Sequence, residues 1–143
     1  MLKEKVDKLV DKYLDEVISI RRHIHQNPEL SLKEFETSKF VANELRKIGL
    51  EAQEGVGKTG VVSNLNLGKG EKTLMLRADM DALPIQEETG LPFSSKNPGV
   101  MHACGHDIHT SILLGVTKVL NEIKDEINGN VKFVFQPAEE NNP

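Results

Sequence analysis

The stretch TLMLRADMD at residues 73–81 decides the fold class, because an apolar run gives way at once to two acidic residues. Residues 73–78 predict a strand that is buried on both faces at the centre of a sheet. Two further strands are predicted by GVVSNLNL at 60–67 and VKFVF at 131–135, and a turn is predicted at 68–70. In two of the three cases a polar cluster follows the apolar strand directly.

Three helices are predicted from apolar residues that recur every three or four positions. Their apolar stripes are Val6, Val10, Tyr13, Val17, Ile20 and Ile24, then Phe35, Val41, Leu45 and Ile48, then Ile108, Ile112, Val116, Val119 and Ile123. Ser31 and Glu34 have the spacing of a capping box that would open the second helix. Residues 84–103, rich in proline and glycine, predict a long functional loop. Helices that alternate with short apolar strands predict an α/β domain with a largely parallel sheet.

Composition excludes several classes of protein. The chain has 143 residues, 38% hydrophobic and 28% charged, which is typical of one folded domain. With a net charge of −4 and no basic cluster beyond Arg21-Arg22, nucleic acid is not an expected partner. No run approaches the roughly 20 apolar residues of a membrane span, and the N-terminus does not resemble a signal peptide. The single cysteine rules out an internal disulfide, and a cytoplasmic location is expected.

The polar clusters lie at residues 77–81, 102–109 and 136–140. In open α/β sheets, ligands bind beyond the carboxyl ends of the strands. If the strands before the first and third clusters are parallel, both clusters reach the same edge, and the helix after the second cluster begins there. The sequence therefore predicts that carboxylates, imidazoles and a thiol meet in one place.

Metal binding is the chemistry that these groups share. Thiolate, neutral imidazole and carboxylate are the usual ligands of zinc and related ions. Cys104 and His106 flank a glycine that permits the backbone to bend, and Glu140 is the candidate third ligand. Glu139, beside a ligand, is the candidate acceptor of a proton from water.

Each of these residues also has an ordinary structural interpretation. A lone cysteine is usually a small core residue, a Glu-Glu pair is usually solvated, and two acids after a strand can cap a turn. His23 and His25 are two apart on a helix, which indicates surface or interface positions. His109, Asp79 and Asp107 are secondary candidates, for contact with substrate or support of a ligand.

Four segments resemble the aminoacylase, hippurate hydrolase and auxin-conjugate hydrolase family of metal-dependent amidohydrolases, which is related to the zinc carboxypeptidases. They are RRHIHQNPELSLKEFET at 21–37, LRADMDALPIQE at 76–87, MHACGHDIHTSILLG at 101–115 and VFQPAEE at 134–140. The segments follow the family's order and span essentially the whole chain. The resemblance implies a zinc-exopeptidase-like α/β/α sandwich with a mixed sheet, which hydrolyses N-acyl amino acids or a C-terminal peptide bond.

The resemblance also implies roles for individual residues. Cys104, His106 and Glu140 fall on metal ligands, and Glu139 falls on the general base. Asp81 falls on the acid that supports a metal-binding histidine two residues earlier, where this chain has Asp79. The implied cofactor is zinc or manganese, with two ions in the complete enzyme.

Members of the family are longer than this chain and carry an inserted dimerisation domain. We therefore expect residues 1–143 to be the N-terminal part of the catalytic domain, with the dimerisation domain and the rest of the catalytic domain absent. A small N-acyl amino acid or peptide is the expected substrate, and the oligomeric state stays open. Two alternatives are a cysteine hydrolase that uses Cys104 and His106, and a non-catalytic remnant that binds metal or a partner subunit.

Overall fold

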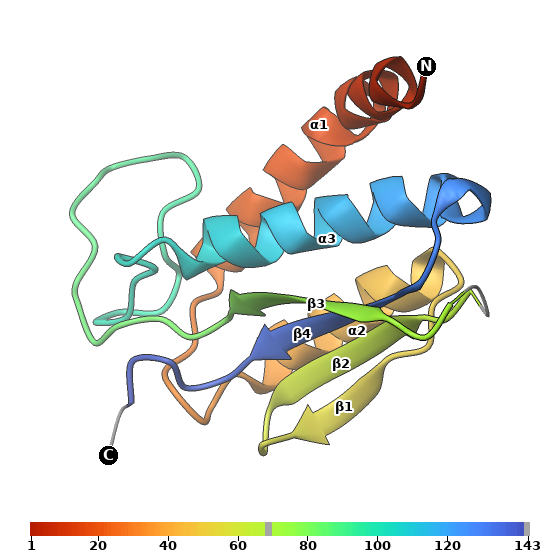
Figure 1. Cartoon of the computed structure of the whole chain (residues 1–143). Helices are drawn as coiled ribbons and strands as arrows, with labels where there is room; N and C mark the ends of the chain where they lie inside the picture. The colour runs from red at the N-terminus through yellow and green to blue at the C-terminus, as the bar shows by residue number, and fades with distance from the viewer. Residues whose placement is uncertain (68–69, 142–143) are drawn as a thin grey trace.

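The computed structural model describes residues 1–67 and 70–141 (Figure 1). The elements, in chain order, are α1 (Leu2–Gln26), α2 (Phe35–Lys47), β1 (Gln53–Val56), β2 (Gly60–Leu65), β3 (Thr73–Asp79), α3 (His106–Glu122), a 3-10 turn (Lys124–Glu126) and β4 (Asn130–Gln136). The predicted helices and strands are all present, and the short exposed strand β1 was not predicted. Residues 68 and 69 of the predicted turn lie outside the described residues. None of the described helices has the length and apolar character to cross a membrane.

Helix α2 begins later than its sequence indicates. The helix starts at Phe35 with Glu34 as its N-cap residue, and the carboxylate of Glu29, rather than a capping box, accepts the N–H groups of Glu36 and Thr37 at 3.1 and 2.6 Å. The capping box is lost because both of its residues bond elsewhere. Ser31 donates to Asp81 at 2.6 Å, while the buried Glu34 accepts the hydroxyl of Thr59 at 2.6 Å and the Ala138 N–H at 2.8 Å. Tertiary hydrogen bonds have outcompeted local capping.

The sheet has four strands in the order β1-β2-β4-β3. Strand β2 pairs antiparallel with both β1 and β4, and only β3 with β4 is parallel. The mixed sheet is confirmed, although its parallel part is limited to one pair. The prediction that residues 73–78 form a central buried strand is wrong for the described chain, because β3 lies at an end of the sheet, with Leu74 60% and Met75 61% exposed.

The helices pack on one face of the sheet. Core-facing Val61 and Leu65 of β2 and Val131, Phe133 and Phe135 of β4 form one cluster with apolar residues of all three helices. In Figure 1, α2 passes behind the strands, α3 lies above them, and α1 packs on α3. The other face carries Val62, Asn64, Lys132 and Val134, and no helix within residues 1–67 and 70–141 covers it. The α/β class is thus confirmed, with helices on one face only in this part of the molecule.

Helix α3 is rotated relative to its predicted stripe. Ile108 and Ile112 are 43% and 54% exposed, whereas His106, Asp107 and Thr110 are buried. The polar residues turn inward because they have partners there: the hydroxyl of Thr110, for example, donates to the carbonyl of Asp79 at 2.7 Å. The prediction of an apolar stripe therefore failed at the end of the helix nearest the polar clusters.

Candidate metal centre

The parallel pairing of β3 and β4 brings two of the polar clusters together. Asp79 is the register partner of Gln136, so Asp81 and the Glu139–Glu140 pair leave the same edge of the sheet. The backbone N–H of Glu140 donates to the carboxylate of Asp81 at 2.9 Å, which joins the two segments beyond the strand ends. The convergence that was predicted for the first and third clusters is confirmed.

The second cluster, residues 102–109, lies at the start of α3. Gly105 is the N-cap residue, with φ of 95° in the left-handed region that favours glycine. The turn directs His106 into the protein, where its ring is 2% exposed, while Cys104 stays exposed on the other side of the glycine. Glycine at 105 thus allows the thiol and the imidazole to approach one point from opposite sides of a bend.

The two ring nitrogens of His106 have different surroundings. Nδ1 lies 2.8 Å from the carbonyl oxygen of Asp81 and 3.2 Å from its Oδ1. Because a carbonyl oxygen can only accept, Nδ1 donates to Asp81, which leaves Nε2 as the ring nitrogen that can bind a metal ion. Nε2 faces three carboxylates: Asp79 Oδ1 at 3.6 Å, Glu139 Oε2 at 3.7 Å and Glu140 Oε1 at 3.7 Å. These separations are too long for hydrogen bonds.

Asp81 is the buried support of this imidazole. Burial opposes its charge, but hydrogen bonds from the Ser31 hydroxyl and from backbone N–H groups, including that of Glu140, outweigh burial and lower the pKa of Asp81. The ionised carboxylate fixes the tautomer of His106 and raises the basicity of Nε2, as is typical of histidines that bind metal. The structure therefore places Asp81 beside His106, whereas the resemblance implied support of a histidine at position 79, which this chain lacks.

Cys104, His106 and Glu140 form a group whose ligand atoms lie within 4.8 Å of one another. A hydrogen bond to Glu140, burial, and the nearby charges of Glu140, Glu139 and Asp79 raise the pKa of the Cys104 thiol to about 11. A protonated thiol is a poor nucleophile, so this environment opposes the cysteine-hydrolase alternative. A bound cation would reverse the effect, because it favours the thiolate.

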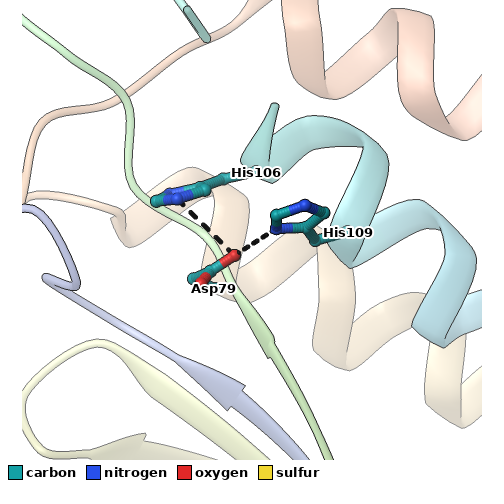
Figure 2. A group of neighbouring side chains, drawn as sticks. All are labelled: Asp79, His106 and His109. Atoms are coloured by element: carbon teal, nitrogen blue, oxygen red, sulfur yellow. Dashed lines mark hydrogen bonds and ion pairs between the residues drawn. The ribbon is translucent and has the colours of Figure 1, made fainter. Parts of the chain in front are cut away.

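A second group consists of Asp79, His106 and His109 (Figure 2). His109 Nδ1 lies 2.7 Å from Asp79 Oδ1, and the other oxygen of Asp79 is 3.3 Å from Arg77 Nη2. Both groups use His106, which has only Nε2 free because Nδ1 is held by Asp81. One lone pair binds one ion, so His106 can serve only one of the two groups.

Similarity to known proteins identifies the family of the chain. Residues 75–143 match the model of peptidase family M20/M25/M40. Over 140 residues, the chain is 54% identical to thermostable carboxypeptidase 2 of Saccharolobus solfataricus and 48% identical to an N-acyl-L-amino acid amidohydrolase of Geobacillus stearothermophilus. These matches cover 97% and 98% of the chain. The chain belongs to the M20 family.

The match extends to solved structures of M20 proteins. The Bacillus subtilis YxeP protein, described as a dinuclear metal binding peptidase of the M20 family, superposes with a TM-score of 0.86 at 44% identity. That match covers 91% of this chain and 36% of YxeP. The chain likewise spans 36% and 38% of the carboxypeptidase and the amidohydrolase. Family membership confirms the resemblance, and the chain corresponds to little more than a third of each of these relatives.

The donor set of this M20 chain fits a divalent ion. Bonds of about 2.0–2.1 Å in a tetrahedral site place ligand atoms about 3.3–3.5 Å apart, close to the separations around Nε2. Three carboxylates facing an unprotonated nitrogen repel one another unless a cation lies between them. The mixture of thiol, imidazole and carboxylate suits zinc, and the carboxylates also suit manganese.

Some residues near the centre were not predicted. His25 was expected at the surface but is buried, with Nδ1 2.8 Å from Asp107 and Nε2 3.1 Å from Glu87. Asp107 was expected to contact substrate or support a ligand, and it binds His25 and Arg21. Arg21 and His25 are four residues apart and so share one face of α1, a spacing from which a shared contact could have been predicted. His23 is exposed, as expected, and stacks on Phe40.

Proposed function

We propose that the chain forms the N-terminal part of a catalytic domain that hydrolyses amide bonds with the help of divalent metal ions. The observation that carries this proposal is the environment of His106, whose Nδ1 is held by Asp81 and whose Nε2 faces three carboxylates. This is how a histidine is held ready to bind an ion. Membership of the M20 family supports the same reading.

Cys104, His106 and Glu140 are the proposed ligands of one ion, zinc or manganese, and we propose two ions in the complete enzyme. The two-ion proposal is supported by YxeP, which is described as dinuclear. When bound, the ions would polarise the scissile carbonyl and stabilise the charge that develops on its oxygen. Asp79 and His109 are candidates for contact with substrate or for support of the ligands.

Glu139 is the proposed general base. Its Oε2 lies 3.7 Å from His106 Nε2, and its side chain is 36% exposed, so water reaches it. The carboxylate would take a proton from the attacking water and pass it to the departing amine. Asp81 keeps His106 in place throughout, since its hydrogen bonds do not change when the proton moves.

The proposed substrates are N-acyl amino acids or peptides cut at a C-terminal bond. They are supported by the names of the amidohydrolase and the carboxypeptidase that the chain resembles. A soluble cytoplasmic setting remains part of this proposal. We expect the chain alone to show little turnover, since it spans 36% of the carboxypeptidase that it resembles.

The test joins this chain to the remaining two thirds of the Geobacillus amidohydrolase and assays the chimaera on a panel of N-acyl amino acids and peptides. Glu139→Gln keeps the shape of the side chain but cannot accept the proton, so kcat should fall about 10²–10⁴-fold. Metal content should stay unchanged. Near-normal kcat in this variant would assign the base elsewhere, and a chimaera that binds metal without turnover would favour the non-catalytic alternative.

A further inference from the structure

A buried charged cluster lies behind the candidate metal centre and shares no residue with it. It joins α1, the loop of residues 84–105 and the first turn of α3. His25 Nδ1 is 2.8 Å from Asp107 Oδ2, and His25 Nε2 is 3.1 Å from Glu87 Oε1. Arg21 Nε donates to the same oxygen of Asp107 at 2.8 Å. The side chains of His25, Asp107 and Glu87 are 4%, 1% and 2% exposed, so the two contacts of His25 are largely shielded from water, whereas the Arg21 side chain is 28% exposed.

The contacts place His25 between two acids. Both ring nitrogens face carboxylate oxygens, and an ionised carboxylate can only accept hydrogen bonds. His25 therefore bridges Asp107 and Glu87 through the two sides of its ring. Hydrogen bonds from Thr89, Ser95 and His25 outweigh burial and hold the pKa of Glu87 at about 2, which keeps that partner ionised. Arg21 adds a permanent cation beside Asp107, which offsets part of the cost of burying an acid there.

The cluster fixes both segments that carry the soft metal donors. Asp107 follows His106 directly in the first turn of α3. Glu87 lies in the loop that ends at Gly105, and its second oxygen accepts the Ser95 N–H at 2.6 Å. The same loop is tied to the end of α1 by the Lys96 N–H, which donates to the Gln26 carbonyl at 2.9 Å. His25 thus connects the helix start that carries His106 to the loop that carries Cys104.

We infer that His25 is a positioning residue of the metal centre, because it ties the helix turn that carries His106, through Asp107, to the loop that leads to Cys104, through Glu87. This inference rests on the proposed metal centre. Without the His25 ring, Asp107 keeps only Arg21, and Glu87 keeps only Thr89 and Ser95. The direct link between the first turn of α3 and the preceding loop is then lost, so the two segments that carry the thiol and the imidazole are free to shift relative to each other.

The test loads the chain with Co²⁺ and compares His25→Ala with wild type. The dissociation constant, from competition with a chelator, should rise about 10-fold, the low end for residues that support ligands. The absorption bands of Co²⁺, which report the geometry of the donors, should also shift. His23→Ala is the matched control, since His23 lies on the same helix but is exposed and outside the cluster. It should change neither quantity.

Glu87→Gln provides a second test if His25→Ala fails to fold, because the amide has the shape of the carboxylate and lacks only its charge. It should change affinity and spectrum in the same direction as His25→Ala. If the variants have a lower free energy of unfolding than wild type but keep its affinity for Co²⁺ and its Co²⁺ absorption spectrum, the inference is overturned. The role of His25 is then purely structural. Failure of the metal centre itself has a different signature: wild type binds no Co²⁺, or Cys104→Ala binds it as tightly as wild type.

Discussion

At the scale of single residues, the decisive feature is that the two ring nitrogens of His106 have different partners. Asp81 takes Nδ1, which leaves Nε2 as the only lone pair that this ring can offer. Two groups of side chains compete for it, one with Cys104 and Glu140 and the other with Asp79 and His109. Asp79 already has His109 at 2.7 Å and Arg77 at 3.3 Å, which partly neutralises its charge. The group with Cys104 is therefore expected to take the ion.

That competition yields a first prediction. Cys104→Ala should weaken Zn²⁺ binding by about 10-fold or more, whereas His109→Ala should leave the affinity within about twofold of wild type. Isothermal titration of the metal-free chain measures both values. If His109→Ala weakens Zn²⁺ binding more than Cys104→Ala does, His106 binds the ion together with Asp79 and His109. Equal losses of affinity in the two variants would mean that ions bind at both groups.

A second prediction concerns acid and Glu87. The pKa of this carboxyl is about 2 in the folded chain, below its ordinary value of 4.5, so its ionised form stabilises the fold. This contribution is complete above pH 4.5 and is lost as pH falls from 4.5 towards 2. Glu87→Gln lacks it. Wild type should therefore be more stable than the variant above pH 4.5, and the difference in free energy of unfolding should shrink towards pH 2.

Urea unfolding of both proteins at a series of pH values gives this difference directly. Other carboxylates titrate in the same range, but their effects are common to both proteins and cancel. A difference that stays constant between pH 5 and 2.5 would show that the fold does not depend on ionised Glu87.

At the scale of elements, local sequence patterns predicted the helices and strands but not every helix boundary or buried face. Helix and strand segments followed from periodicity, because burial of one face is what periodicity reports. The start of α2 did not follow from the sequence pattern. Ser31 bonds to Asp81, and Glu34 bonds to Thr59 and to the Ala138 N–H, instead of forming the predicted capping box. The prediction of which face of α3 is buried was wrong for a related reason, since the first turn of the helix buries polar groups of the site. The site residues were predictable from their types, whereas the support from His25 required the fold.

The contact between α1 and α3 yields a third prediction. A Cβ on Gly115 would lie 2.8 Å from Val17 Cγ2, so glycine lets the two helices approach closely. Gly115→Ala should destabilise the chain by about 1–3 kcal/mol through this clash. In a Val17→Ala background the same change should stabilise by roughly 0.5–1 kcal/mol, the intrinsic advantage of alanine in a helix.

Thermal or urea unfolding of the four proteins closes this double-mutant cycle. The two expected effects differ by about 1.5–4 kcal/mol, and this difference is the coupling energy between residues in direct contact. Additive effects would mean that α1 moves away from α3 without cost and that Gly115 does not set their distance.

At the scale of the whole molecule, the sheet has an open face and an open edge within the described residues. Leu74 and Met75 are more than half exposed on β3, whose outer edge pairs with no strand of residues 1–67 and 70–141. The order of the strands in the sheet could not be predicted from the sequence. An apolar strand can lie at the centre of a sheet or at its edge, and apolar content alone does not distinguish the two positions. Exposed apolar strands with free backbone groups favour pairing between chains.

We therefore expect the purified chain to self-associate through β3. Met75→Lys should shift the mass in sedimentation velocity towards the monomer, because lysine on an edge strand disfavours pairing. Ile85→Lys is the matched control: Ile85 is 44% exposed but lies in the loop after the sheet. A monodisperse wild-type monomer, or an equal response to both variants, would place the association elsewhere or remove it.

The parallel pairing of β3 with β4 also dictates an order of events during folding. The two strands are separated in sequence by the long loop and the whole of α3, so they meet late, after local helices have formed. Cys104 and His106 are neighbours from the outset, whereas Glu140 joins them only when β4 docks. An ion added to the denatured chain can therefore attach to the thiol and the imidazole before the carboxylate arrives. Refolding with metal present from the start and refolding with metal added last should follow different time courses.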